Sequence, residues 1–353
     1  MPTTLWHING QGFHFGRHGL GQEESFETLP SDTLFAALLN CLAELQGTDS
    51  MKRWVQAFQG TDPPFTFTSA FPRAGEVHFY PLPLQQPKAS ANYERHEATI
   101  KEIQFVSEGV FRKLIDGISV EDLLPDEEKI KDFLLQGKEI LLLPEERERL
   151  PKTVKEDGFL WEVKPRSRAM IGRIHPSAGI FQTGRISYAK ECGLWFGCRL
   201  DDPQNEHYQQ LPDIFHALGD AGLGGIRSAG FGLAKFQNMG SIDLPGMNGK
   251  PWVTLSRYLP KVGEISALTH PQAAYSLINV EGWVQSAGKK SERRRALNMV
   301  CEGSVLGPVA DSHPGEMVDI QPDYDGQRPL KHEVWRNGRA FAVGISTSEG
   351  KGG

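Results

Sequence analysis

Residues 222–232 read Gly-Leu-Gly-Gly-Ile-Arg-Ser-Ala-Gly-Phe-Gly, with five glycines in eleven positions. Because glycine has no Cβ, the backbone N–H groups of such a run stay uncovered and can point at an anion. An amphipathic stretch over 211–218 precedes the run, and a strand-like stretch over 231–236 follows it. Arg227 and Lys235 add positive charge. The order of helix, basic glycine loop and strand predicts a ferredoxin-like domain that contacts a polynucleotide backbone.

Two mononucleotide-binding loops fit this stretch less well. Gly225 and Gly230 have the spacing of a Walker loop, but Phe231 stands where that loop requires lysine. Gly222 and Gly224 begin a Rossmann-like spacing that lacks its third glycine. A flexible turn without a ligand stays open as the alternative.

Length and composition set bounds on the class of protein. A chain of 353 residues predicts two domains with insertions, and a hydrophobic content of 39% supports well-formed cores. The formal net charge of −6 means that affinity for nucleic acid must come from local basic patches.

The cysteines indicate no zinc site and no disulfide framework. They form neither a Cys-x-x-Cys pair nor a cluster with zinc-ligand spacing, and they are Cys41, Cys192, Cys198 and Cys301. We therefore expect free thiols in a reducing cytoplasm. The sequence shows no signal peptide and no apolar run near eighteen residues, so we expect a cytoplasmic protein without membrane insertion.

A basic stretch precedes the glycine loop. Residues 164–190 hold six basic side chains and no acidic one, with apolar residues interleaved. Pro176 and Gly179 predict the turn of a long hairpin at the centre of this stretch. Such a hairpin can lie along phosphates while Ile174 or His175 wedges between bases. An edge hairpin with solvated arginines is the alternative.

Two further charged stretches are less specific. A second basic run over 289–295 follows Trp283, and a solvated loop explains it as well as a binding role does. Residues 121–149 hold ten acidic against five basic side chains, which indicates a polar insertion facing water or protein.

The expected fold class is α+β, with two ferredoxin-like (RRM-like) domains in tandem, a helical insertion and a long β-hairpin. We place the N-terminal domain at 1–240, with the insertion at 88–150 and the hairpin at 162–190. The C-terminal domain follows at 241–345, and residues 346–353 form a disordered tail.

The expected elements follow from apolar patterning. Ser31 and Asp32 read as the start and cap of a helix that extends to Leu45. Other helices are expected over 107–115 and 204–218. Strands are expected over 4–15, 65–71, 77–80, 158–163, 193–200, 252–259, 273–284, 296–306, 317–320 and 334–345.

These residues resemble a known family over nearly the whole chain. The glycine loop is similar to the signature of RAMP proteins, the ferredoxin-like RNA binders of CRISPR systems. Several further stretches resemble the Cas5-like subunits of type III-A CRISPR (Csm) effector complexes, and they lie at 31–38, 64–72, 101–105, 282–284, 302–304 and 334–341. The insertion and the mildly acidic charge depart from the family pattern.

The resemblance implies a subunit without catalytic activity, cofactor or metal. It implies antiviral defence, with the subunit binding the repeat-derived 5′ tag of the guide RNA (crRNA). It also implies docking of the large polymerase-like Cas subunit and contact with a backbone RAMP subunit. The residues expected to contact RNA are Arg17, His18, Ser31, Lys164, Arg166, Arg168, Arg173, Ile174, His175, Phe181, Arg185, Gly222, Gly224, Gly225, Ile226, Arg227, Ser228, Gly230 and Gly232.

A nuclease is the competing hypothesis. His14 and His18 flank Arg17, and RAMP nucleases that process precursor crRNA place a catalytic histidine in a comparable region. Those enzymes carry their glycine loop near the C-terminus, whereas more than a hundred residues follow it here. Helix capping accounts for Asp32, and packing accounts for Cys192 and Cys198. An RNA-binding module outside CRISPR is a third possibility.

Overall fold

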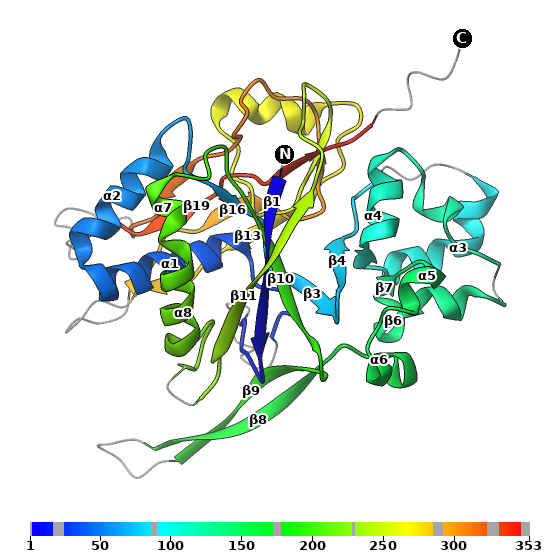
Figure 1. Ribbon diagram of the computed structural model, residues 1–353, viewed down its shortest axis with the longest axis horizontal. Coiled ribbons are helices and arrows are strands. Elements are labelled where there is room, and N and C mark those ends of the chain that lie inside the picture. Colours follow the sequence, from blue (N-terminus) through cyan, green and yellow to red (C-terminus); the bar gives the residue numbers. More distant parts are fainter. Residues whose placement is uncertain are drawn as a thin grey trace.

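The computed structural model describes residues 2–16, 25–85, 90–126, 128–171, 178–227, 230–284, 292–322 and 332–346 (Figure 1). The helices are α1 (Ser31–Gln46), α2 (Thr48–Gln59), α3 (Ala91–Glu102), α4 (Glu108–Ile115), α5 (Pro144–Arg147), α6 (Lys152–Asp157), α7 (Glu206–Gln209) and α8 (Leu211–Ala221). Short 3₁₀ turns are η1 (Val120–Asp122), η2 (Ile130–Phe133), η3 (Gln136–Lys138) and η5 (Val262–Thr269).

The first strands are β1 (Pro2–Gly10), β2 (Thr66–Phe67), β3 (Phe71–Ala74), β4 (Val77–Pro81), β5 (Phe105–Ser107), β6 (Leu134–Leu135), β7 (Ile140–Leu141), β8 (Trp161–Ile171), β9 (Ala178–Tyr188), β10 (Cys192–Arg199) and β11 (Ala234–Asp243). One sheet runs in the order β11-β1-β10-β3-β4-β5-β7-β6, with β2 also paired to β10. Within it, β1, α1, β3, β10, α8 and β11 follow the βαββαβ order of a ferredoxin-like unit.

The central strands β1 and β10 are buried on both faces. On one face, Trp6 of β1 contacts Phe215 of α8 edge-on, with ring centroids 4.9 Å apart. On the other, Trp195 of β10 lies 4.6 Å from Tyr80, which stacks on Phe111 of α4. Figure 1 shows α1 and α8 on one side of the central strands and the helices of the insertion on the other. The central strands therefore present no free face to a ligand, whereas the edge strand β11 is largely exposed.

The predicted insertion contains the expected helix as α4, together with α3. It is less purely helical than expected, because β5, β7 and β6 continue the main sheet beyond β4. The insertion therefore packs on the N-terminal core through backbone hydrogen bonds.

Several predicted boundaries are wrong. The first strand ends at Gly10, and the segment after it crosses to the β8–β9 hairpin. The strand expected over 65–71 is divided into β2 and β3. The strand at 77–80 pairs with β3, with Arg73 opposite His78 and Ala74 opposite Val77. The helix expected over 204–218 is divided into α7 and α8 at Gln210.

The C-terminal half contains small sheets. Its strands are β12 (Trp252–Thr254), β13 (Leu277–Val280), β14 (Trp283–Val284), β15 (Glu292–Arg293), β16 (Leu297–Val300), β17 (Val305–Leu306), β18 (Met317–Asp319), β19 (Trp335–Asn337) and β20 (Ala342–Gly344). β12 pairs with β17 and β20, and the others form the pairs β13–β16, β14–β15 and β18–β19. Among its described residues the helical segment is η5, so a second ferredoxin-like domain is not confirmed.

A buried ion pair joins the two halves. The Asp32 carboxylate lies 2.6 Å from the Arg336 guanidinium, and these side chains are only 2% and 3% exposed. Asp32 is therefore not a helix cap: α1 begins at Ser31, is preceded by Pro30, and has no capping side-chain hydrogen bond. The charge is neutralised by the other half of the chain.

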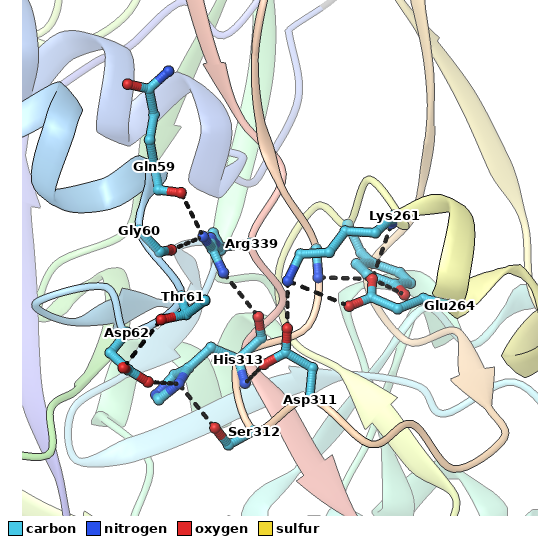
Figure 2. Close-up of polar contacts among 12 residues, drawn as sticks. Gln59, Gly60, Thr61, Asp62, Lys261, Glu264, Asp311, Ser312, His313 and Arg339 are labelled. Atoms are coloured by element: carbon cyan, nitrogen blue, oxygen red, sulfur yellow. Dashed lines mark hydrogen bonds and ion pairs between the residues drawn. The ribbon is translucent and has the colours of Figure 1, made fainter.

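Arg339 makes a second connection (Figure 2). Its guanidinium donates to the carbonyl oxygens at the end of α2, including that of Gly60, and to the carbonyl oxygen of His313 at 3.0 Å. His313 Nε2 lies 3.1 Å from a carboxylate oxygen of Asp201 in the loop after β10. A cation at a helix C-terminus satisfies exposed carbonyls and complements the helix dipole. The 334–341 stretch thus holds the two halves together.

None of the helices in the described ranges combines the length and apolar composition needed to cross a bilayer.

Candidate nucleic-acid interface

Three segments meet at one end of the sheet: the glycine loop, residues 11–16, and the base of the β8–β9 hairpin. The N–H groups of Gly225 and Gly232 donate to the carbonyl oxygens of His14 and Gly12, each at 2.9 Å. Phe13 and Ile186 exchange backbone hydrogen bonds of 2.9 and 3.0 Å. Residues 11–16 thereby connect the glycine loop to the hairpin.

The backbone of the glycine loop alternates in handedness. Gly222, Gly224 and Ile226 have φ values of +86°, +81° and +59°, whereas Leu223 and Gly225 between them do not have positive φ. Alternation of this kind turns successive N–H groups toward a shared concavity and is typical of anion-binding nests. Ile226 is β-branched, for which positive φ is a strained conformation found mainly at functional sites.

The loop uses some of its amides internally. Those that donate within the protein belong to Gly222, Leu223, Gly225, Gly230 and Gly232. The expectation of a free amide at Gly225 is therefore wrong. The amides of Gly224, Ile226 and Arg227 have no acceptor among the described residues. Among the loop residues that the structure describes, these three N–H groups are available to a phosphate.

Close packing explains several of the glycines. A Cβ on Gly224 would lie 2.5 Å from the His14 carbonyl oxygen. A Cβ on Gly232 would collide with the Leu223 carbonyl oxygen, and Gly222 and Gly232 are both buried. These two predicted RNA contacts therefore close the loop instead of facing solvent. Gly225, Arg227 and Gly230 are exposed.

The β8–β9 hairpin presents an excess of positive charge. Lys164 lies directly opposite Arg185 in the strand register, and like charges so placed repel. Lys164 pairs with Glu162 at 2.6 Å. Arg166 is exposed and has no ion-pair partner among the described residues. A polyanion along this face would relieve the repulsion.

Arg185 links the three segments. Its guanidinium lies over the Phe231 ring, 5.4 Å from the centroid, and donates to the Gln11 carbonyl oxygen at 3.3 Å. Gly12 leaves room for it, because a side chain there would overlap the guanidinium. Arg185 therefore positions the hairpin relative to the glycine loop as well as supplying charge.

The remaining predicted RNA contacts are buried, lie along the hairpin, or fall outside the described residues. Ser31 is buried, and its hydroxyl accepts the backbone N–H of Arg257 at 3.0 Å, so this side chain does not face the interface. Arg168 and Phe181 lie opposite one another in the hairpin register. The predicted contacts outside the described residues are Arg17, His18, Arg173, Ile174, His175 and Ser228.

His14 has a structural environment. It is buried, and its Nδ1 lies 2.7 Å from the Gly184 carbonyl oxygen. Because a carbonyl only accepts, Nδ1 carries the proton. The imidazole joins residues 11–16 to the hairpin, a role that sequence reasoning missed because no local motif marks it.

Burial keeps several other cysteine and histidine side chains uncharged. Burial raises the pKa of Cys192 to about 12 and also raises that of Cys198, which fits packing roles. Burial, with Arg73 nearby, lowers the pKa of His7 to about 3 and that of His78 to about 4. Their Nε2 atoms are 2.8 Å apart, so one neutral ring donates to the other. Within the described ranges, no cluster of three or more His, Cys, Asp or Glu side chains is arranged to hold a metal ion.

Comparison with protein-family models adds a decisive observation. Residues 247–345 match the CRISPR Csm4 C-terminal domain. The C-terminal part of the chain is therefore similar to Csm4 proteins. This agrees with the resemblance read from the sequence, including the stretches at 282–284 and 334–341. A search of curated protein sequences found no match.

Solved structures share the fold of this chain. A chain of the crystal structure of a Csm3–Csm4 subcomplex in the type III-A CRISPR-Cas interference complex matches with a TM-score of 0.64 and 17% identity, covering 98% of this chain and 100% of that one. Chains of Csm1–Csm4 cassettes match likewise. The cassette with pppApA gives 0.51 and 17% identity, covering 99% and 100%, and the cassette with AMPPNP gives 0.52 and 18%, covering 98% of both. The mixed sheet with its flanking helices thus shares the fold of these solved chains.

Proposed function

We propose that the protein is a non-catalytic subunit of a type III-A Csm ribonucleoprotein complex that binds the 5′ tag of crRNA. The observation that carries the RNA-binding role is the meeting of three segments at one end of the sheet. There the amides of Gly224, Ile226 and Arg227 lack acceptors within the part of the chain that the structure describes, and the connected hairpin carries Lys164 opposite Arg185. Backbone amides and arginines are the usual ligands of nucleic-acid phosphates.

We propose two protein partners from the comparisons. The similar chains come from structures of Csm3–Csm4 and Csm1–Csm4 assemblies. By analogy, this chain contacts a backbone RAMP subunit and docks the large polymerase-like subunit in antiviral defence. The division into two domains is part of the same proposal, but residue 240 lies within β11, so we propose the boundary between the end of β11 at Asp243 and the start of the matched domain at residue 247.

Salt dependence tests the basic hairpin. Replacing Lys164, Arg166 and Arg185 with Gln should flatten the slope of log K against log salt by about two units, because each phosphate contact to a single strand contributes about 0.7. The measurement is the dissociation constant for an RNA carrying the repeat-derived tag, at several salt concentrations.

The matched control removes three exposed cations, two in the insertion and one in α6. Arg95, Lys101 and Lys152 are solvent-exposed and far from the hairpin in sequence. Their replacement with Gln should leave the slope unchanged. Equal slopes for the two triple variants would show that the hairpin cations are merely solvated.

Purified protein should leave repeat-containing RNA intact, with or without Mg²⁺, while shifting it in a gel. The buried His14 holds the Gly184 carbonyl oxygen and does not face solvent. A general acid or base needs access to the reacting hydroxyl. Cleavage that disappears in His14→Ala or His18→Ala would instead establish the processing endoribonuclease.

A further inference from the structure

Trp283 is exposed in a chain that buries its other tryptophans. Its side chain is 65% exposed, whereas Trp335 is half-buried and the remaining ones are buried, namely Trp6, Trp54, Trp161, Trp195 and Trp252. Tryptophan is among the largest apolar side chains and is highly buried on average. Its exposure on the surface of the C-terminal half therefore indicates a contact with a binding partner.

A basic side chain lies beside the ring. Trp283 is directly opposite Arg293 in the β14–β15 ladder, so both side chains stand on the same face. The Arg293 side chain is 67% exposed, and one nitrogen contacts the Glu281 carboxylate. Because a guanidinium has five N–H donors, this contact orients it and leaves further donors for a ligand. Val284, the next residue on the strand, is buried.

The backbone under Trp283 is held in place. The N–H of Arg294 donates to the Gly282 carbonyl oxygen at 3.0 Å, and its guanidinium donates to the Glu281 carbonyl oxygen at 2.6 Å. A Cβ on Gly282 would lie 2.6 Å from that guanidinium, so glycine lets the Arg294 side chain pack against the backbone here. Arg295 donates to the Asp319 carbonyl oxygen at 2.6 Å, which ties the ladder to β18. The exposed ring thus rests on a fixed support.

We propose that Trp283 and Arg293 form a contact for single-stranded RNA on the C-terminal half, separate from the glycine loop. A base stacks on the Trp283 ring, and its phosphate binds Arg293. An exposed aromatic ring beside an arginine offers both features of single-strand binding, a stacking face and a positive charge. Three consecutive arginines, 293–295, make this short segment basic, which complements RNA. The inference rests on the proposed RNA-binding function and adds a second contact to it.

Tryptophan fluorescence tests the contact, because Trp283 is exposed whereas the other tryptophans are buried or half-buried. Titrating the full-length protein with a hexauridylate should quench the solvent-exposed emission in a saturable way. Trp283→Leu should weaken binding about 5–150-fold, the range expected from loss of one stacked base, whereas Trp283→Phe should retain most of the affinity. Arg293→Gln should flatten the salt slope by about 0.7.

Leu277→Ala is the matched control. Leu277 is an exposed apolar residue of neighbouring β13, and its removal should leave affinity unchanged. If Trp283→Leu binds as tightly as Leu277→Ala while the Lys164, Arg166 and Arg185 variant binds weakly, this inference is wrong and the proposed function stands. If the intact protein binds no RNA, both fail. Unchanged RNA affinity with loss of co-purifying Csm subunits would assign Trp283 to a protein interface and overturn the inference.

Discussion

Replacing Asp32 with Ala should lower the free energy of unfolding by about 3–5 kcal/mol, the cost of leaving one partner of a buried ion pair alone. Arg336 would keep its charge, buried, without the carboxylate that lies 2.6 Å away. The same pair joins α1 to β19, so its loss also loosens the contact between the two halves. Urea denaturation followed by circular dichroism measures the change.

Two companion variants separate the buried charge from general damage. Asp32→Leu with Arg336→Met removes both charges and should recover most of the stability, since apolar residues of similar volume can replace a buried pair. Glu97→Ala breaks an exposed pair with Lys101 and should leave stability unchanged. A loss in Asp32→Ala no larger than in Glu97→Ala would refute the role of the ion pair.

Gly224→Ala should weaken binding of the tag RNA at least tenfold, about 1.4 kcal/mol. Residue 224 has a φ of +81°, and the new Cβ would lie 2.5 Å from the His14 carbonyl oxygen. The loop must then move away from residues 11–16, which displaces the amides of Gly224, Ile226 and Arg227. Fluorescence anisotropy with labelled RNA reports the affinity.

Gly230→Ala provides an unusually close control. Gly230 belongs to the same loop and has the same φ of +81°, but no atom of the described residues lies within 4 Å of its Cβ position. Both variants carry the same backbone strain, so the difference between them isolates the contact with His14. RNA affinity reduced equally in the two variants would mean that the loop's position against residues 11–16 is irrelevant.

The sequence predicted the N-terminal elements well where a local pattern marks them. The apolar run after Ser31 and the helix over 107–115 are both present, as α1 and α4. Hydrophobic periodicity does not predict where an element ends when a contact with a distant part of the chain sets that boundary. The first strand stops at Gly10 although apolar residues continue, because Phe13 pairs with Ile186 of the hairpin.

The sequence identified residues of the candidate site but not the hydrogen bonds that connect them. The glycines, Arg185 and Arg227 stand out in the sequence, yet their spacing does not reveal which amides the protein uses itself. Gly225 is satisfied by His14, a residue about two hundred positions earlier. Asp32 illustrates the same limit, since a helix start looks alike whether its carboxylate caps the helix or meets Arg336.

The Asp32–Arg336 pair also determines when α1 can complete its packing during synthesis of the chain. The two residues are 304 positions apart. At about 5–20 residues per second, a ribosome needs roughly 15–60 s to travel from one to the other. Throughout that interval the nascent N-terminal half carries a carboxylate whose buried partner does not yet exist. Completion of α1 packing therefore waits for nearly the whole chain, and a prematurely terminated product cannot imitate the finished subunit.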